Sequence, residues 1–241
     1  MTIARSTLPA ALRGPARSAG AGQPVASQRV ADILADRILS GRIPPGARIK
    51  QDELAEELNT SRIPVRDALR ILEARGLVTL RANAGARVAS MTLRDLEISY
   101  EIRERIEPLL LADSVPNLTD RDISEMHLVR EQLETTRDVE IFLALDRQFH
   151  WTAYRRHRAP QLHQIIERLW DTTQSYRRAF AALALPGGAR IMLAEHSLLL
   201  HAVERRDADT ASAVLVTEIR RTRVNLGKYG ELGSDETVEQ P

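Results

Sequence analysis

The sequence contains no cysteine, few aromatic residues and no long hydrophobic run. Without cysteine, disulfide bonds, thiolate metal ligands and cysteine nucleophiles are excluded, and the composition fits a reducing compartment. No apolar stretch approaches the roughly 20 residues that a membrane-spanning helix needs. No secretory leader is visible either, so we expect a cytoplasmic protein with no membrane partner.

Charge is distributed unevenly along the chain, although the formal net charge is only +1. No acidic residue precedes Asp32, and the first 26 residues are rich in Pro, Gly, Ala and Arg. This composition predicts a disordered extension at residues 1–26. A transit peptide is the less favoured alternative. The arginines of this region and of the next few residues are Arg5, Arg13, Arg17 and Arg29.

Residues 27–91 carry the pattern of a small DNA-binding domain. Apolar residues recur at helical spacing in three segments, and two short apolar runs separated by turn residues follow them. This order of helix, helix, helix and hairpin predicts a winged helix-turn-helix. The expected elements are helices that begin near Ser27, carry Leu54 to Leu58 and run from Arg62 to Arg75, then strands at Leu77–Leu80 and Arg87–Ala89 with a turn at Asn83–Gly85.

Residues 92–228 are expected to be almost entirely helical, and residues 229–241 to form a flexible tail. Helix starts are marked by capping residues and by a proline at a first helical position. We therefore predict a mainly α protein, in which an all-α antiparallel helical bundle follows the winged helix-turn-helix. The start signals are Thr92 with Asp95, Thr119 with Asp122, Asp138, and Pro160.

The third expected helix has two distinct faces. One is an apolar stripe that would pack on its neighbours, and the other is a stripe of arginines that can grip phosphate or guanine with two hydrogen bonds. Ser61 lies at its N-terminus, where backbone N–H groups favour a phosphate, and Gly85 would let the wing approach DNA. Alone, the arginines could form an ordinary solvated face, but the flanking elements favour a recognition helix. The stripes are Val65, Leu69 and Leu72, and Arg62, Arg66 and Arg70.

These residues resemble the winged-helix domain of the GntR family of bacterial regulators over roughly residues 28–90. The resemblance implies base or phosphate contacts from Arg62 and Arg66, and weaker ones from Ser61, Arg70 and Gly85. Ile63 stands where the family often has Thr. The matching runs are Gly46-Ala47-Arg48-Ile49, Leu54-Ala55, the nine residues from Ser61 to Leu69, Leu72-Glu73 and Gly76-Leu77-Val78.

A second group of polar residues lies on or beside apolar helix faces. Asp146 and His150 are four residues apart, and His196 and Glu218 fall on the stripes of two later helices. Burying such groups without partners costs several kcal/mol on the order of general estimates. The residues alone leave two compensating arrangements open: a divalent metal, or a hydrogen-bond and salt-bridge network that includes an arginine such as Arg103.

The C-terminal half resembles the all-helical FCD ligand-binding domain of the FadR-type subgroup. The resemblance implies metal ligands at Asp146, His150 and His196, with Glu218 where the family has His. The carboxylate disfavours a site restricted to zinc and leaves nickel, manganese and magnesium open. Arg103 would pair with an effector carboxylate; the alternative is a salt bridge to Glu107. The matching stretches are Arg103 with Glu107, Asp146 to His150, Glu195-His196, and Asp207 with Ala211 to Ile219, whereas Ala159 replaces a common Asn.

The sequence thus predicts a transcriptional regulator rather than an enzyme. We expect a homodimer that binds a pseudo-palindromic operator in double-stranded DNA and is controlled by a small organic acid. Two alternatives are a metal-dependent hydrolase built on the polar cluster and an architectural DNA-binding protein without a sensor. The hydrolase lacks a clear general base outside the proposed ligands and leaves the arginine stripe unexplained.

Overall fold

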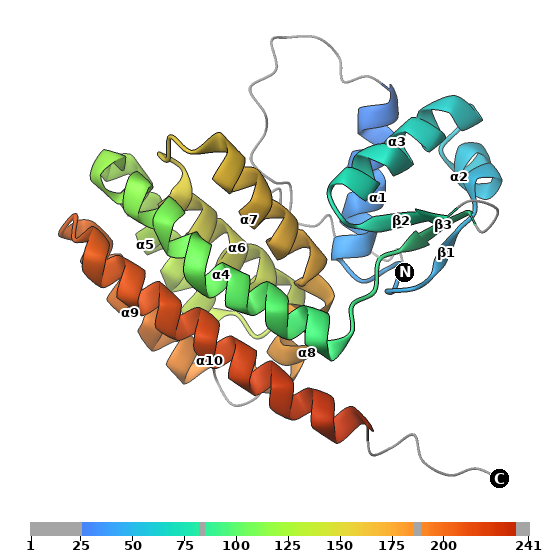
Figure 1. The fold of residues 1–241 in the computed structure, drawn as a ribbon. Coiled ribbons are helices and arrows are strands. Elements are labelled where there is room, and N and C mark those ends of the chain that lie inside the picture. The colour runs from blue at the N-terminus through green and yellow to red at the C-terminus, as the bar shows by residue number, and fades with distance from the viewer. Residues whose placement is uncertain (1–25, 82–84, 186–188, 235–241) are drawn as a thin grey trace, which may run out of the picture.

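A computed structural model describes residues 26–81, 85–185 and 189–234 (Figure 1). Nearly all of the expected disordered extension, part of the hairpin turn at residues 83–84 and the end of the tail lie outside the described residues. The described chain forms a small mixed domain followed by a helical domain, and this confirms the predicted fold class.

The N-terminal domain combines helices with a small antiparallel sheet. The sheet has the strand order β1-β3-β2, with Ile49 opposite Ala86 and Val78 opposite Val88. The short strand β1 was not anticipated from the sequence, because two residues are too few to give a periodic pattern. The elements are α1 (Ala26–Leu39), β1 (Arg48–Ile49), α2 (Gln51–Glu57), α3 (Arg62–Ala74), β2 (Val78–Arg81) and β3 (Gly85–Val88).

The core of this domain lies where α3 packs on α1 and on the sheet. The apolar stripe of α3, formed by Val65, Leu69 and Leu72, is fully buried, as its spacing predicts. Leu34 of α1 is also fully buried against this cluster. Packing this side of α3 leaves its opposite side free to face solvent.

The C-terminal domain is helical throughout its described part. Helix α4 lies beside α10 along one face of the domain, and α6 is buried behind them (Figure 1). None of the described helices combines the length and the apolar composition that crossing a membrane requires. The elements are α4 (Leu93–Ser114), the 3₁₀ turn η2 (Val115–Asn117), α5 (Asp120–Thr135), α6 (Val139–Tyr154), α7 (Pro160–Thr172), α8 (Gln174–Ala184), α9 (Arg190–Glu204) and α10 (Ala208–Ser234).

One helix and the end of another differ from the expectation. Helix α8 was not anticipated as a separate element, because no Gly or Pro lies between Trp170 and Ala184 to mark its start. Helix α10 continues to Ser234, past the expected domain end at residue 228. The flexible tail predicted to begin at residue 229 is therefore helical over its first residues.

The predicted capping residues hold the helix starts in place. Thr119 accepts a hydrogen bond from the Asp122 backbone N–H at 3.2 Å, and Asp122 Oδ2 accepts one from the Thr119 N–H at 2.9 Å. Thr92 and Asp95 form the same capping box at α4. These reciprocal bonds satisfy N–H groups that a helix leaves unpaired.

We expect Thr119→Ala to lower the free energy of unfolding by about 1 kcal/mol, because the α5 cap is lost. Urea denaturation measures this change. Thr217→Ala removes a hydroxyl from an exposed mid-helix position and should change stability by less than about 0.5 kcal/mol. Equal losses in the two variants would contradict a capping role for Thr119.

Candidate functional site

The arginine side of α3 is exposed as its spacing predicts. Arg62, Arg66 and Arg70 all lie at the surface, opposite the buried apolar stripe. Arg62 Nε lies 2.6 Å from Asp52 Oδ1 of α2, yet the Arg62 side chain remains 75% exposed. Such a surface ion pair contributes little and can exchange for a phosphate partner. Ser61 makes no side-chain capping bond, so the N-terminal N–H groups of α3 stay open to a ligand.

Gly85 begins β3 at the wing. Its φ of +77° lies in the left-handed region that favours glycine, and no other part of the described chain comes within 4 Å of where a Cβ would stand. Glycine is therefore well suited to the backbone conformation at this position, and the space beside it is open to a binding partner.

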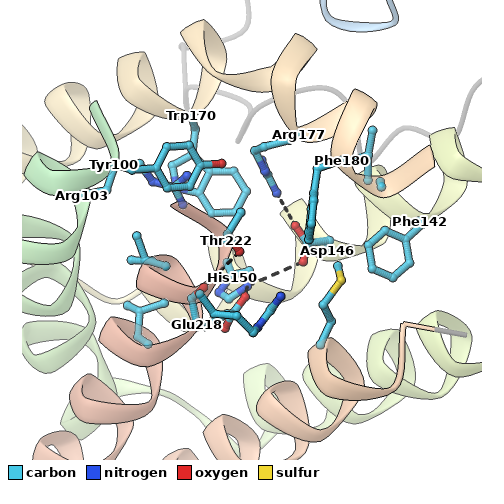
Figure 2. Close-up of a pocket in the computed structure, with 16 residues that line it drawn as sticks. Tyr100, Arg103, Phe142, Asp146, His150, Trp170, Arg177, Phe180, Glu218 and Thr222 are labelled. Atoms are coloured by element: carbon cyan, nitrogen blue, oxygen red, sulfur yellow. Dashed lines mark hydrogen bonds and ion pairs between the residues drawn. The ribbon is translucent and has the colours of Figure 1, made fainter. Parts of the chain in front are cut away.

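Asp146, His150, His196 and Glu218 converge inside the helical domain, and Figure 2 shows three of them, Asp146, His150 and Glu218. Asp146 and His150 come from α6, His196 from α9 and Glu218 from α10. His150 Nε2 lies 3.0 Å from Glu218 Oε1, and His196 Nε2 lies 3.2 Å from Asp146 Oδ1. One ligand atom from each residue lies within 4.8 Å of the others. The helices thus place two imidazoles and two carboxylates around one centre.

The hydrogen bonding of this cluster fits a cation. His196 Nε2 and Glu218 Oε2 are buried and have no hydrogen-bond partner among the described residues. The 3.2 Å approach of His196 to Asp146 is therefore not a well-aligned hydrogen bond. Imidazole nitrogen and carboxylate oxygen are ligands for divalent metals. The cluster could therefore hold a metal ion.

Electrostatics keep both carboxylates of the cluster ionised. Burial raises the pKa of Asp146, but Arg177, His196 and His150 together lower it to about 2. Burial likewise opposes ionisation of Glu218, yet the two histidines hold its pKa well below the usual value. Burial lowers the pKa of His196, whereas Asp146 and Glu218 raise it to about 10. Without a metal, a proton on His196 therefore supplies part of the compensating charge.

Arg103, the residue expected to meet an effector, already has a buried partner. Its Nε donates to Glu107 Oε2 at 2.8 Å, so the alternative salt bridge is present. Glu107 Oε1 also accepts hydrogen bonds from the Tyr154 hydroxyl at 2.7 Å and from Trp170 Nε1 at 2.9 Å. Arg103 lines the cavity beside the cluster, as the resemblance implies, but its charge is neutralised locally.

Arg177 is a buried arginine that the sequence analysis missed. Its NH2 donates to Asp146 Oδ2, and its guanidinium carbon lies 3.9 Å from the centroid of the Trp170 ring. Figure 2 shows the guanidinium pointing at the Asp146 carboxylate. It lies on α8, the helix that was not anticipated, so periodicity gave no face on which to place it.

A cavity opens beside the cluster and includes both arginines in its wall (Figure 2). The space between atoms is about 510 Å³, part of it open to solvent. Its aromatic lining consists of Tyr100, Phe142, Trp170 and Phe180.

Two family models match consecutive parts of the chain. Residues 26–88 match the gntR family of bacterial regulatory proteins, and residues 97–221 match the FCD domain. The chain belongs to the GntR family. It is a DNA-binding transcriptional regulator with a C-terminal FCD domain, and family membership makes it a regulator rather than an enzyme.

Curated relatives and solved structures agree with this assignment. The regulator is 30% identical to the HTH-type transcriptional regulator McbR of Escherichia coli over 185 residues, which cover 75% of this chain and 83% of McbR. It is 26% identical to the gluconate operon transcriptional repressor of Bacillus licheniformis, over 75% of this chain and 76% of the repressor. The solved structure of E. coli McbR/YncC superposes with a TM-score of 0.75 at 27% identity, covering 85% of this chain and 98% of that one.

In this GntR regulator, the helices that line the cavity also contact the DNA-binding domain. Asp171 follows the cavity residue Trp170, and its fully buried carboxylate lies 2.7 Å from Arg75 NH2, just after α3. Tyr176, next to Arg177, hydrogen-bonds the backbone of Met91 between the domains. The cavity and the interdomain contacts therefore share α7 and α8. Further contacts between the domains join Arg168 NH1 to the Ala74 carbonyl at 2.9 Å and Arg178 to the Leu39 carbonyl. Within the helical domain, Arg147 NH2 lies 3.0 Å from Asp171 Oδ1.

We expect the metal-free regulator to lose stability as the pH rises from about 6.5 to about 10. The pKa of His196 is raised from 6.5 to about 10 in the folded state, so its stabilising charge is fully present below 6.5 and is lost as the pH approaches 10. Urea denaturation in the presence of a chelator at several pH values measures this slope.

His196→Gln should flatten the dependence on pH over this range, because the titrating group is gone. His201→Gln, on the exposed side of the same helix, is the matched control and should retain the wild-type slope. The same slope in wild type and His196→Gln would contradict the assignment.

Proposed function

We propose that this regulator is a cytoplasmic homodimer that binds an operator in double-stranded DNA. A small carboxylate effector, bound beside a divalent cation, controls this binding. The observation that carries the proposal is the position of the cavity. Asp146, His150 and Glu218 of the cluster line it, the adjoining His196 Nε2 has no hydrogen-bond partner among the described residues, and the α7–α8 wall also contacts the DNA-binding domain. A ligand there can change the orientation of that domain.

Helix α3 is the proposed recognition helix. Arg62 and Arg66 lie near its N-terminus, where such helices meet base edges, and both are exposed. Arg70 lies one further turn along, where it can reach phosphate, and Ser61 precedes the open N–H groups of the first turn. Gly85 would let the wing backbone approach a minor groove or a phosphate.

A symmetric dimer matches a pseudo-palindromic operator. Each recognition helix of such a dimer reads one half-site, and the half-sites are separated by about one helical turn of DNA or a multiple of it. The two-fold axis of the protein then coincides with that of the operator.

The cation site consists of Asp146, His150, His196 and Glu218. When bound, a divalent cation supplies positive charge and coordination positions for an anionic ligand. The mixed oxygen and nitrogen donors are compatible with zinc, nickel, manganese or magnesium. Arg103 and the aromatic lining complete a cavity for an organic acid with an apolar body.

Effector control follows if the ligand binds one orientation of the domains more tightly than another. The contact between Asp171 and Arg75 spans the two domains, and Asp171 lies next to a residue of the cavity wall. A shift of α7 would therefore alter the position of α3 relative to its partner in a dimer. The effector thereby changes operator affinity.

We expect Arg66→Ala to weaken binding to the DNA upstream of the regulator's own coding region by about 5- to 150-fold, since a base contact contributes about 1–3 kcal/mol. Fluorescence anisotropy at fixed salt measures the affinity. Arg121→Ala removes an exposed arginine from α5 of the other domain and should leave affinity unchanged. Equal affinities of wild type and Arg66→Ala would contradict the proposed recognition helix.

We expect zinc to raise the unfolding temperature of chelator-treated protein, because a ligand present at about 100 times its dissociation constant stabilises the native state by about 2.7 kcal/mol. His150→Gln should lose most of this increase, because it removes one ligand of the cluster. His127→Gln, at an exposed position on α5, should retain it. Calorimetry measures the effect, and an equal increase in all three proteins would place the metal elsewhere.

A further inference from the structure

Arg177 is held in the cavity by a partner that belongs to the cation cluster. Its side chain is 8% exposed, and Asp146 is the carboxylate with which it pairs in the described structure. Its NH1 also donates to Gln174 Oε1 at 3.2 Å, and its guanidinium lies over the ring of Trp170. Apart from Asp146, these contacts are with neutral groups, so Asp146 supplies the neutralising negative charge.

The other arginines of the cavity wall have partners outside the cluster. Arg103 pairs with Glu107, whose second oxygen accepts two further hydrogen bonds. Arg221 pairs with Glu195 through contacts of 2.6–2.9 Å. A ligand would have to break these pairs to use either guanidinium. Binding of a cation to the cluster changes neither pair directly, whereas it does affect the partner of Arg177.

A cation and Arg177 compete for the charge of Asp146. The Oδ1 atom of this carboxylate faces His196 at 3.2 Å, and Oδ2 accepts the hydrogen bond from Arg177. A cation bound at Oδ1 would draw on the same negative charge. The buried guanidinium would then be incompletely neutralised, which is unfavourable in a site with little access to water.

The balance of charge shows what the occupied site would require. Without a cation, the two negative charges of Asp146 and Glu218 outweigh the single positive charge of Arg177. With a divalent cation and neutral imidazoles, the site carries one net positive charge. A single carboxylate restores neutrality, and the planar guanidinium fork can bind it through two hydrogen bonds.

We propose that Arg177 binds the carboxylate of the effector once a divalent cation has engaged Asp146. Cation and effector therefore bind cooperatively, and Arg177 exchanges one carboxylate for another. This inference rests on the proposed function, and it assigns to Arg177 the pairing with the effector carboxylate that the family resemblance implies for Arg103. Tyr176 and Arg178 flank Arg177 on α8. Tyr176 contacts Met91 between the domains, and Arg178 contacts Leu39 of the DNA-binding domain. The exchange at Arg177 therefore takes place on a helix that contacts the DNA-binding domain.

The test measures zinc affinity of the full chain by competition with a chromophoric chelator, with and without acetate as the carboxylate probe. In the wild type, acetate should tighten zinc binding by about tenfold, within the usual range of coupling between two ligands. Arg177→Gln should bind zinc more tightly than the wild type without acetate, because the competitor for Asp146 is gone. Acetate should then tighten its zinc binding by no more than about twofold.

Arg221→Gln is the matched control and should show the wild-type coupling, because its partner Glu195 lies outside the cluster. Comparison at equal acetate concentration cancels the effect of acetate on free zinc. Wild-type coupling in Arg177→Gln, or its loss in Arg221→Gln alone, would overturn the proposal. If Arg177→Gln fails to fold, Arg177→Lys retains the charge without the fork and should reduce the coupling.

Two further results separate this inference from the function on which it rests. A folded wild type that binds operator but no zinc overturns the role of Arg177 and the metal site, and leaves DNA binding intact. A wild type that binds zinc with acetate coupling but has no affinity for DNA contradicts the regulator function, and leaves the role of Arg177 standing.

Discussion

The helical domain depends on the neutralisation of charges that it buries. Taking a carboxylate or a guanidinium out of water costs several kcal/mol, and only close, well-oriented partners recover that cost. Each buried pair therefore fixes the relative positions of the helices that contribute to it. Asp146, for example, links α6 to both α8 and α9. The cluster around Asp146 differs from the fully paired examples, because some of its buried polar atoms have no hydrogen-bond partner among the described residues. The fully paired examples are Arg103 with Glu107 and Arg221 with Glu195.

This difference connects the chemistry of the cavity to the DNA-binding domain. A saturated ion pair resists change, whereas an under-coordinated cluster can accept a cation and redistribute its partners. In the proposed mechanism, the redistribution reaches Arg177 on α8, and the same helix contacts Met91, between the domains, through Tyr176. Asp171, near the end of α7, adds an ion pair to Arg75, just after α3. In this proposal, the adjacent helices α7 and α8 join ligand sensing to DNA binding.

Much of this arrangement could be predicted from the sequence. The stripes of α3 follow from residue spacing, and the capping boxes at Thr92 and Thr119 mark helix starts locally. Spacing also placed the four members of the cluster on buried faces, whereas their convergence depends on helix packing that no local pattern encodes. Arg177 was missed because α8 begins without a Gly or Pro, and its partner Asp146 is 31 residues away. The pairing of Arg103 with Glu107 was foreseen only as an alternative, because the surroundings of a side chain decide between a local and a distant partner.

The central claim is that the buried cluster is a cation site whose occupation changes the partner of Arg177. Anomalous diffraction from crystals of the purified regulator, recorded at the absorption edge of the bound element, tests this directly. The account predicts a peak bounded by Asp146, His150, His196 and Glu218, with the guanidinium of Arg177 turned toward an anion. Crystals grown with saturating metal that show no peak there, and in which Arg177 stays paired with Asp146, would contradict it.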